Sequence, residues 1–93
     1  MIDIQLPPPN WIAPPPLTMI ELRLSLAQIE TICRALGAAN AEAQKDVFGC
    51  SVWGAGGCLI VVPKVEMGST EQDQARVRKH EVAHCNGWRH ESR

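Results

Sequence analysis

Two triple-proline runs, in the segment "PPPNWIAPPP" at residues 7–16, constrain the folding of this chain more than any other feature. The segment holds six of the seven prolines. Proline fixes φ and lacks a backbone N–H, so we expect extended, polyproline-like backbone rather than helix or central strand. The regular structure must then come from residues 19–93, and residues 1–18 form an arm. This arm is either a tail or a strap that docks Trp11 and Ile12 onto the folded body.

Size and charge exclude several classes of protein. The chain has 93 residues and a formal net charge of -1, which allows one small domain with a thin core. Since basic residues cluster no further than Arg76, Arg78 and Lys79, we expect no nucleic-acid binding. The longest apolar run, residues 58–62, is too short to span a membrane. The N-terminus does not resemble a signal peptide, which makes a cytoplasmic location the default expectation.

After the arm, the sequence alternates between apolar and charged residues. Ile20, Leu22 and Leu24 are separated by Glu21 and Arg23. This period of two predicts a strand with one buried face, formed by the three apolar side chains.

The next segment has the signals of a helix. Ser25 and Gln28 have the spacing of a capping box, and apolar residues then recur on one helical stripe. Gly37 is a suitable C-terminal stop. We therefore predict a helix over residues 26–36.

Two apolar segments on either side of "GAGG" predict a β-hairpin over residues 47–62. If the turn centres near Gly54, Cys50 lies opposite Cys58. A disulfide between these two cysteines is then geometrically allowed, although two buried thiols would give the same pattern. Cys85 is expected in the core against the first helix, near Cys33.

A second helix is predicted over residues 70–86. Ser69 and Gln72 have capping-box spacing at its start, and Gly87 follows its end. The order strand, helix, hairpin, helix predicts the α+β class, with a small sheet and a C-terminal helix.

The second helix carries "HEVAHCNGWRH", which holds all three histidines of the chain. His80 and His84 are one turn apart, so both imidazoles can bind the same ion. Gly87 is placed to form a structural turn that brings His90 back toward them. Three imidazoles leave a fourth position for water, as in catalytic zinc sites. The spacing therefore predicts a Zn²⁺ site with His80, His84 and His90 as ligands.

Glu81 follows the first histidine and is offset around the helix, where it can contact a metal-bound water. Zinc lowers the pKa of such a water to about 7. Glu81 would accept the proton as general base and pass it to the leaving amine. The sequence thus predicts a zinc metalloendopeptidase that acts on a polypeptide substrate.

"HEVAHCNGWRH" resembles the zinc-binding consensus of the metzincin metallopeptidases. In that family the three histidines bind zinc, the glutamate is the general base and the glycine forms the turn. The resemblance assigns these roles to the residues at positions 80, 84, 90, 81 and 87.

The resemblance also implies a zincin-like domain with a backing helix. It implies that an edge strand, expected within residues 58–62, pairs with extended substrate. Because no methionine follows the motif, we expect a minimal form that lacks the C-terminal subdomain and methionine turn of the family.

Two other hypotheses fit the sequence. In one, zinc only fastens the C-terminal turn, and the domain binds a protein partner through its sheet edge without catalysis. In the other, the proline-rich arm lies in the cleft of a peptidase and holds it latent. A second copy of the chain, in a homo-oligomer, is one source of the contacts that a minimal form would lack.

Overall fold

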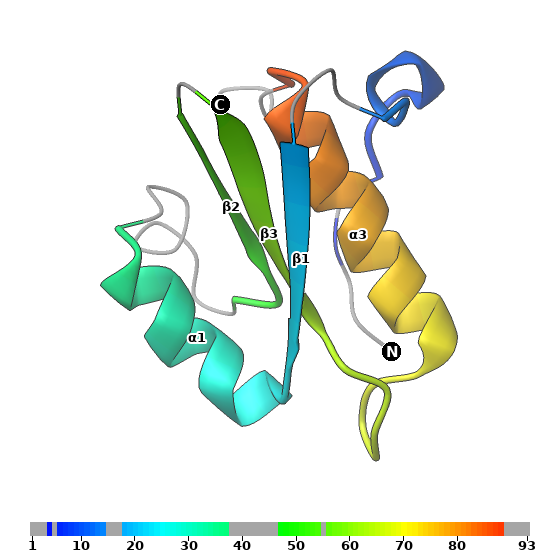
Figure 1. Ribbon diagram of the computed structural model, residues 1–93. Helices are drawn as coiled ribbons and strands as arrows, with labels where there is room; N and C mark the ends of the chain where they lie inside the picture. Colours follow the sequence, from blue (N-terminus) through cyan, green and yellow to red (C-terminus); the bar gives the residue numbers. More distant parts are fainter. Residues whose placement is uncertain (1–3, 5, 15–17, 38–46, 55, 89–93) are drawn as a thin grey trace, which may run out of the picture.

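The computed structural model describes residues 4, 6–14, 18–37, 47–54 and 56–88. These residues form an α+β fold, which confirms the predicted class (Figure 1). No helix within these ranges is long and apolar enough to cross a membrane. The elements are, in chain order, η1 (Pro9–Trp11), β1 (Thr18–Leu24), α1 (Leu26–Ala35), β2 (Cys50–Gly54), β3 (Gly57–Pro63) and α3 (Glu71–Cys85).

The sheet has the strand order β1-β3-β2, with β1 parallel and β2 antiparallel to β3. The predicted hairpin is therefore present. The prediction of an edge strand within residues 58–62 is wrong, because β1 pairs along the other side of β3 and makes it the central strand. Within the described part of the chain, β1 and β2 are the edges of the sheet.

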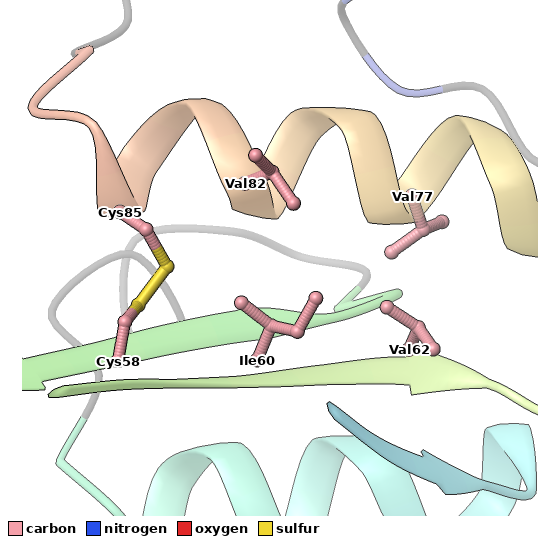
Figure 2. Close-up of a cluster of buried hydrophobic side chains, with 6 residues drawn as sticks. All are labelled: Cys58, Ile60, Val62, Val77, Val82 and Cys85. Carbon is pink, nitrogen blue, oxygen red and sulfur yellow. A yellow bond between two sulfur atoms is a disulfide. The ribbon is translucent and has the colours of Figure 1, made fainter. Parts of the chain in front are cut away.

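The two helices cover opposite faces of this sheet (Figure 1). On one face, side chains of β3 meet α3 in a buried cluster of Cys58, Ile60, Val62, Val77, Val82 and Cys85 (Figure 2). On the other face, α1 packs in a second cluster of Ile29, Cys33, Val47, Cys50 and Val61. The alternation of side chains along β3 supplies both clusters, because successive residues point to opposite faces.

Helix α1 begins and ends close to the predicted positions. The Gln28 side-chain oxygen accepts hydrogen bonds from the Ser25 N–H at 3.4 Å and the Ser25 hydroxyl at 3.0 Å. Gly37 has a φ of +72°, which suits a glycine that ends a helix. The sequence signals therefore located both ends of this helix to within a residue or two.

Helix α3 begins one residue later than its capping signal predicted. Thr70, not Ser69, is the N-cap: its hydroxyl accepts from the Asp73 N–H at 3.1 Å, and the Asp73 carboxylate accepts from the Thr70 N–H at 3.0 Å. Asp73 can fill the third helical position as well as Gln72 can, so the two possible boxes overlap in sequence. Gly87, with a φ of +97°, follows the helix as predicted.

Strand β1 has the predicted alternation, but its apolar face is only partly covered. Ile20 is 58% exposed and Leu22 is 39% exposed, whereas Leu24 is half-buried against the α1 cluster. Helix α1 starts directly after β1 and packs near the end of that strand. The expectation that all three apolar side chains are buried is therefore wrong for the first two.

The cysteines form two disulfides, Cys33–Cys50 and Cys58–Cys85. The predicted Cys50–Cys58 pairing is wrong because the hairpin has another register. Cys50 pairs with Val61, and Cys58 pairs with Trp53. Cys50 consequently faces α1 while Cys58 faces α3 (Figure 2). Cys85 is a core residue, as expected, but it lies against β3 and away from the α1 cluster.

The described part of the proline-rich arm lies against α3. The side-chain amide of Asn86 donates hydrogen bonds to the carbonyl oxygens of Trp11 at 2.8 Å and Ala13 at 2.7 Å. Trp11 is half-buried, and Ile4 packs against the cluster between α3 and β3. This contact corresponds to the strap alternative.

Candidate functional site

Helix α3 brings two of the predicted ligands together. The Nε2 atoms of His80 and His84 are 3.2 Å apart, and both side chains are buried. The Nδ1 atom of His84 lies 2.7 Å from the Trp88 carbonyl oxygen. Because a carbonyl only accepts, His84 donates from Nδ1, which leaves its Nε2 as an acceptor for the Nε2–H of His80. When both imidazoles are neutral, one hydrogen bond can therefore join their Nε2 atoms.

Trp88 packs against this histidine pair. Its ring centroid lies 5.3 Å from that of His80 and 5.0 Å from that of His84. The contact with His80 is edge-to-face, a geometry that stabilises aromatic pairs. Gly87 lets the chain reverse after α3 and places Trp88 there. The turn predicted from Gly87 thus positions an aromatic cover over the pair.

Glu81 lies in the interior and not on an open surface. Its side chain is 1% exposed, and its Oε1 atom has no hydrogen-bond partner. Burial raises the pKa of Glu81 to about 8, and the opposing effect of a hydrogen bond with the Ser51 side chain is smaller. Gly49 lies beside this carboxyl group, and a Cβ there would clash with the Val61 carbonyl oxygen and the Val77 side chain, each at 2.6 Å. Near neutral pH, Glu81 is therefore mainly a protonated acid.

The prediction of a Zn²⁺ site is wrong for the residues that the structure describes. They contain no group of three or more His, Cys, Asp or Glu side chains that could hold a metal ion. His80 and His84 supply only two donors, and all four cysteines are consumed in disulfides. The third predicted ligand, His90, lies outside the described residues.

The chain matches no protein-family model, no curated protein and no solved structure. The resemblance to metzincins therefore has no support beyond eleven residues of sequence, and the structure contradicts it because the described residues provide no third donor. The assignment of this chain as a minimal metzincin is accordingly corrected. The α+β arrangement and the predicted active-site helix are present without the metal centre.

A second feature lies at the hairpin end of the sheet. A hollow of about 370 Å³ is bordered by all three strands. Ile20, Leu59 and Val52 occupy one register line across the sheet, and Gly54 pairs with Gly57 beside them. The hollow is lined by Thr18, Ile20, Val52, Trp53, Gly54, Gly56, Gly57, Cys58 and Leu59.

This hollow suits an apolar group. No lining side chain is ionisable, since Cys58 is in a disulfide. The facing glycines contribute no side chains, which leaves space on the face of the sheet that carries Val52 and Leu59. Trp53 is 51% exposed. An exposed tryptophan beside an apolar hollow is a common feature of protein-binding surfaces.

Sequence reasoning did not identify Trp53 as a site residue. The available signal was a tryptophan directly before "GAGG", at the predicted turn of the hairpin. That signal becomes specific only with the hairpin register, which places Gly54 against Gly57 and sets Val52 beside Leu59.

Proposed function

We propose that this domain is a non-catalytic binding module for an extended polypeptide. The partner places an apolar side chain in the hollow beside Trp53, and its backbone pairs with the edge strand β2. The observation that carries this proposal is the half-exposed Trp53 ring at an apolar hollow next to a strand edge. In this mode of recognition, main-chain hydrogen bonds provide affinity and the pocket provides side-chain specificity.

The two disulfides support a binding function that needs a rigid sheet. Cys33–Cys50 fastens α1 to β2, and Cys58–Cys85 fastens α3 to β3. The sheet thereby keeps its shape in a domain too small for a large core. Because such bonds persist under oxidising conditions, we further propose that the domain works in an oxidising compartment. This replaces the cytoplasmic default.

The peptidase activity expected from the sequence stays a prediction. It depended on a zinc-bound water next to Glu81, and the corrected donor set does not support that arrangement. A binding function requires no third donor and uses the exposed side chains of the sheet. We therefore favour binding over catalysis.

The proposal is tested by selecting ligands from a displayed peptide library and measuring their affinities by calorimetry. Trp53→Ala should weaken a selected peptide by about tenfold or more, because exposed tryptophans often dominate interfaces. Its melting temperature should stay near that of the wild type, since half of the side chain is already in water. Met67→Ala is the control, because Met67 is fully exposed and does not border the hollow.

A second variant fills the hollow. A Cβ at Gly54 meets no atom within 4 Å, so Gly54→Val should fold normally and block the apolar side chain of the ligand. If no peptide is selected, or if the selected peptides bind Trp53→Ala and Gly54→Val as tightly as the wild type, the proposed function is wrong.

A further inference from the structure

We propose that two copies of this chain form a symmetric dimer through β1, which joins their sheets edge to edge with the two β1 strands antiparallel. The surface involved is the free edge of β1, on the opposite side of the sheet from β2. The inference does not depend on the binding function proposed for the hollow. It rests on the backbone of β1, its charge pattern and its exposed apolar face.

The outer edge of β1 is long and regular. Among the described residues, β1 pairs only with β3, and the register is continuous from Thr18↔Gly57 to Leu24↔Pro63. Prolines, lysines and β-bulges usually protect an edge strand from pairing with another strand. Strand β1 contains no proline and no lysine, and its register shows no bulge. The described backbone hydrogen bonds of the N-terminal arm stay within the arm and do not reach β1.

The direction of the backbone groups follows from one hydrogen bond. The Leu24 carbonyl oxygen accepts from the Lys64 N–H at 2.8 Å, so the polar groups of Leu24 face β3. Backbone groups alternate in direction along a strand. The N–H and C=O groups of Met19, Glu21 and Arg23 therefore face outward, free to pair with another strand.

The sequence of β1 is self-complementary around Leu22. When two antiparallel copies meet with Leu22 on the two-fold axis, Glu21 of each copy lies opposite the partner's Arg23. Both residues have outward backbone groups, so each such pair exchanges two backbone hydrogen bonds as well as joining opposite charges. The neighbouring register would place Glu21 opposite the partner's Glu21, which like-charge repulsion disfavours.

The Glu21 side chain is already held in position for this contact. It accepts hydrogen bonds from Arg78 Nε at 2.6 Å and Arg78 Nη2 at 3.0 Å. Arg23 Nε lies 2.7 Å from the same carboxylate, while 60% of the Arg23 side chain is exposed. An arginine from a partner would therefore approach an ordered carboxylate.

The opposite face of β1 supplies apolar contacts. Ile20 and Leu22 are 58% and 39% exposed, and both lie on the face away from Glu21. In the self-complementary register, Leu22 meets the partner's Leu22, and Ile20 lies across from the partner's Leu24. The dimer would cover the apolar part of the sheet that α1 leaves exposed. A second copy is therefore favoured over an unrelated strand as the partner. Both the charge pattern and the apolar pattern of β1 match those of a copy related by the two-fold axis.

The test measures the mass of the whole chain by sedimentation over a wide range of concentrations, together with amide hydrogen exchange. The expected result is a reversible dimer, with slower exchange at the Glu21 and Arg23 amides as concentration rises. Arg23→Glu places like charges in both cross-strand pairs and should weaken dimerisation by about tenfold or more. Arg34→Glu makes the same charge change on α1, away from the edge, and should leave the dimer unchanged.

Mixing two charge variants tests the register of the two β1 strands. Glu21→Arg and Arg23→Glu chains should each dimerise poorly alone, yet form a mixed dimer, because opposite charges then face each other in both pairs. If Glu21→Arg fails to fold without its Arg78 contact, the comparison of Arg23→Glu with Arg34→Glu alone tests whether the dimer forms through β1. A monomer at all concentrations overturns the proposal. So does a dimer that Arg23→Glu leaves intact, or one whose protected amides belong to β2. A monomer, or a dimer that Arg23→Glu leaves intact, does not bear on peptide binding by the hollow, whereas a dimer through β2 would occupy the edge proposed for the peptide.

Discussion

Glu81 shows how strongly the position of one side chain decides its chemistry. The sequence places it next to His80, where a general base would be expected. The fold buries its carboxyl group beside Ser51 and Gly49, with one oxygen unpaired. Burial of a charged form is costly, so the proton is retained and the pKa rises. The residue that looked like a base is thus mainly protonated at neutral pH.

The pKa of Glu81 predicts a dependence of stability on pH. Its folded value is about 8, above the ordinary value of 4.5. A raised pKa means that the folded state binds the proton more tightly than the unfolded state. The resulting stabilisation is complete below pH 4.5 and is lost as pH rises toward 8. Its slope reaches about 1.4 kcal/mol per pH unit at most.

Glu81→Gln should remove this dependence, because the amide keeps the shape and cannot ionise. Urea unfolding between pH 4 and 9 should show the variant gaining stability over the wild type as pH rises, by a few kcal/mol at pH 8. Glu71→Gln, on the exposed first turn of the same helix, is the control and should follow the wild-type profile. Parallel curves for Glu81→Gln and wild type would contradict the buried, protonated acid.

For single residues, sequence reasoning succeeded where local spacing decides the geometry. His80 and His84 face each other because one helical turn separates them, and Gly87 ends the helix because it tolerates a positive φ. The Zn²⁺ site required convergence of a third donor from beyond the helix, and local spacing cannot establish that. Burial of Glu81 was also beyond prediction, since it involves Ser51 of β2 and the neighbouring Gly49, which are distant in sequence.

The elements differ in how well their sequences specify them. Helix α1 has a cap, an apolar stripe and a glycine stop, so both ends were predictable. The register of the β2–β3 hairpin was not, because a glycine-rich turn allows several pairings and each brings different cysteines together. A shift of an odd number of residues also moves a side chain to the opposite face. This separates Cys50 from Cys58 and directs them to different helices.

The Cys58–Cys85 disulfide should fix the end of α3 to the sheet (Figure 2). It closes a loop with a sequence separation of 27 residues, for which loop-closure entropy gives about 3.5 kcal/mol. Replacing both cysteines with alanine should lower the free energy of unfolding by about that amount. Urea titration measures the loss, and amide exchange should quicken in the last turns of α3.

The other disulfide provides a matched control. Replacing Cys33 and Cys50 with alanine should cost a similar free energy, because its sequence separation of 17 residues is only somewhat shorter. The faster exchange should then appear in α1 instead of α3. If either double variant loosens both helices equally, the two disulfides do not act on separate elements.

In the molecule as a whole, the described residues form a small sheet between two helices, and the class followed from the order of elements. What the sequence did not reveal is which surfaces remain uncovered. Helix α1 shields only the part of the sheet near Leu24, and this leaves Ile20, Leu22 and the hollow beside Trp53 accessible. The functional proposals rest on these uncovered surfaces. They depend on how far a helix extends across a sheet, which hydrophobic periodicity does not determine.

The proline-rich arm receives two hydrogen bonds from one side chain of the folded body. Asn86, at the end of α3, donates to two carbonyl oxygens of the arm, Trp11 and Ala13, across more than seventy residues of sequence. Asn86→Ala removes both donors and should lower the free energy of unfolding by about 1–2 kcal/mol. Asn86→Asp keeps the size but cannot donate, and it adds negative charge at a helix C-terminus, so it should cost at least as much.

Amide exchange locates the effect of these substitutions. The Trp11 and Ile12 amides donate to the carbonyl oxygens of Pro8 and Pro9 in and around η1, at 3.0 and 3.2 Å. Both amides should exchange faster in the Asn86 variants, since the arm would lose its hydrogen bonds to the end of α3. Asn10→Ala is the control, because Asn10 is an exposed amide in the same segment. If η1 stays equally protected without the Asn86 donors, apolar contacts such as those of Ile4 hold the arm, and the role assigned to Asn86 is wrong.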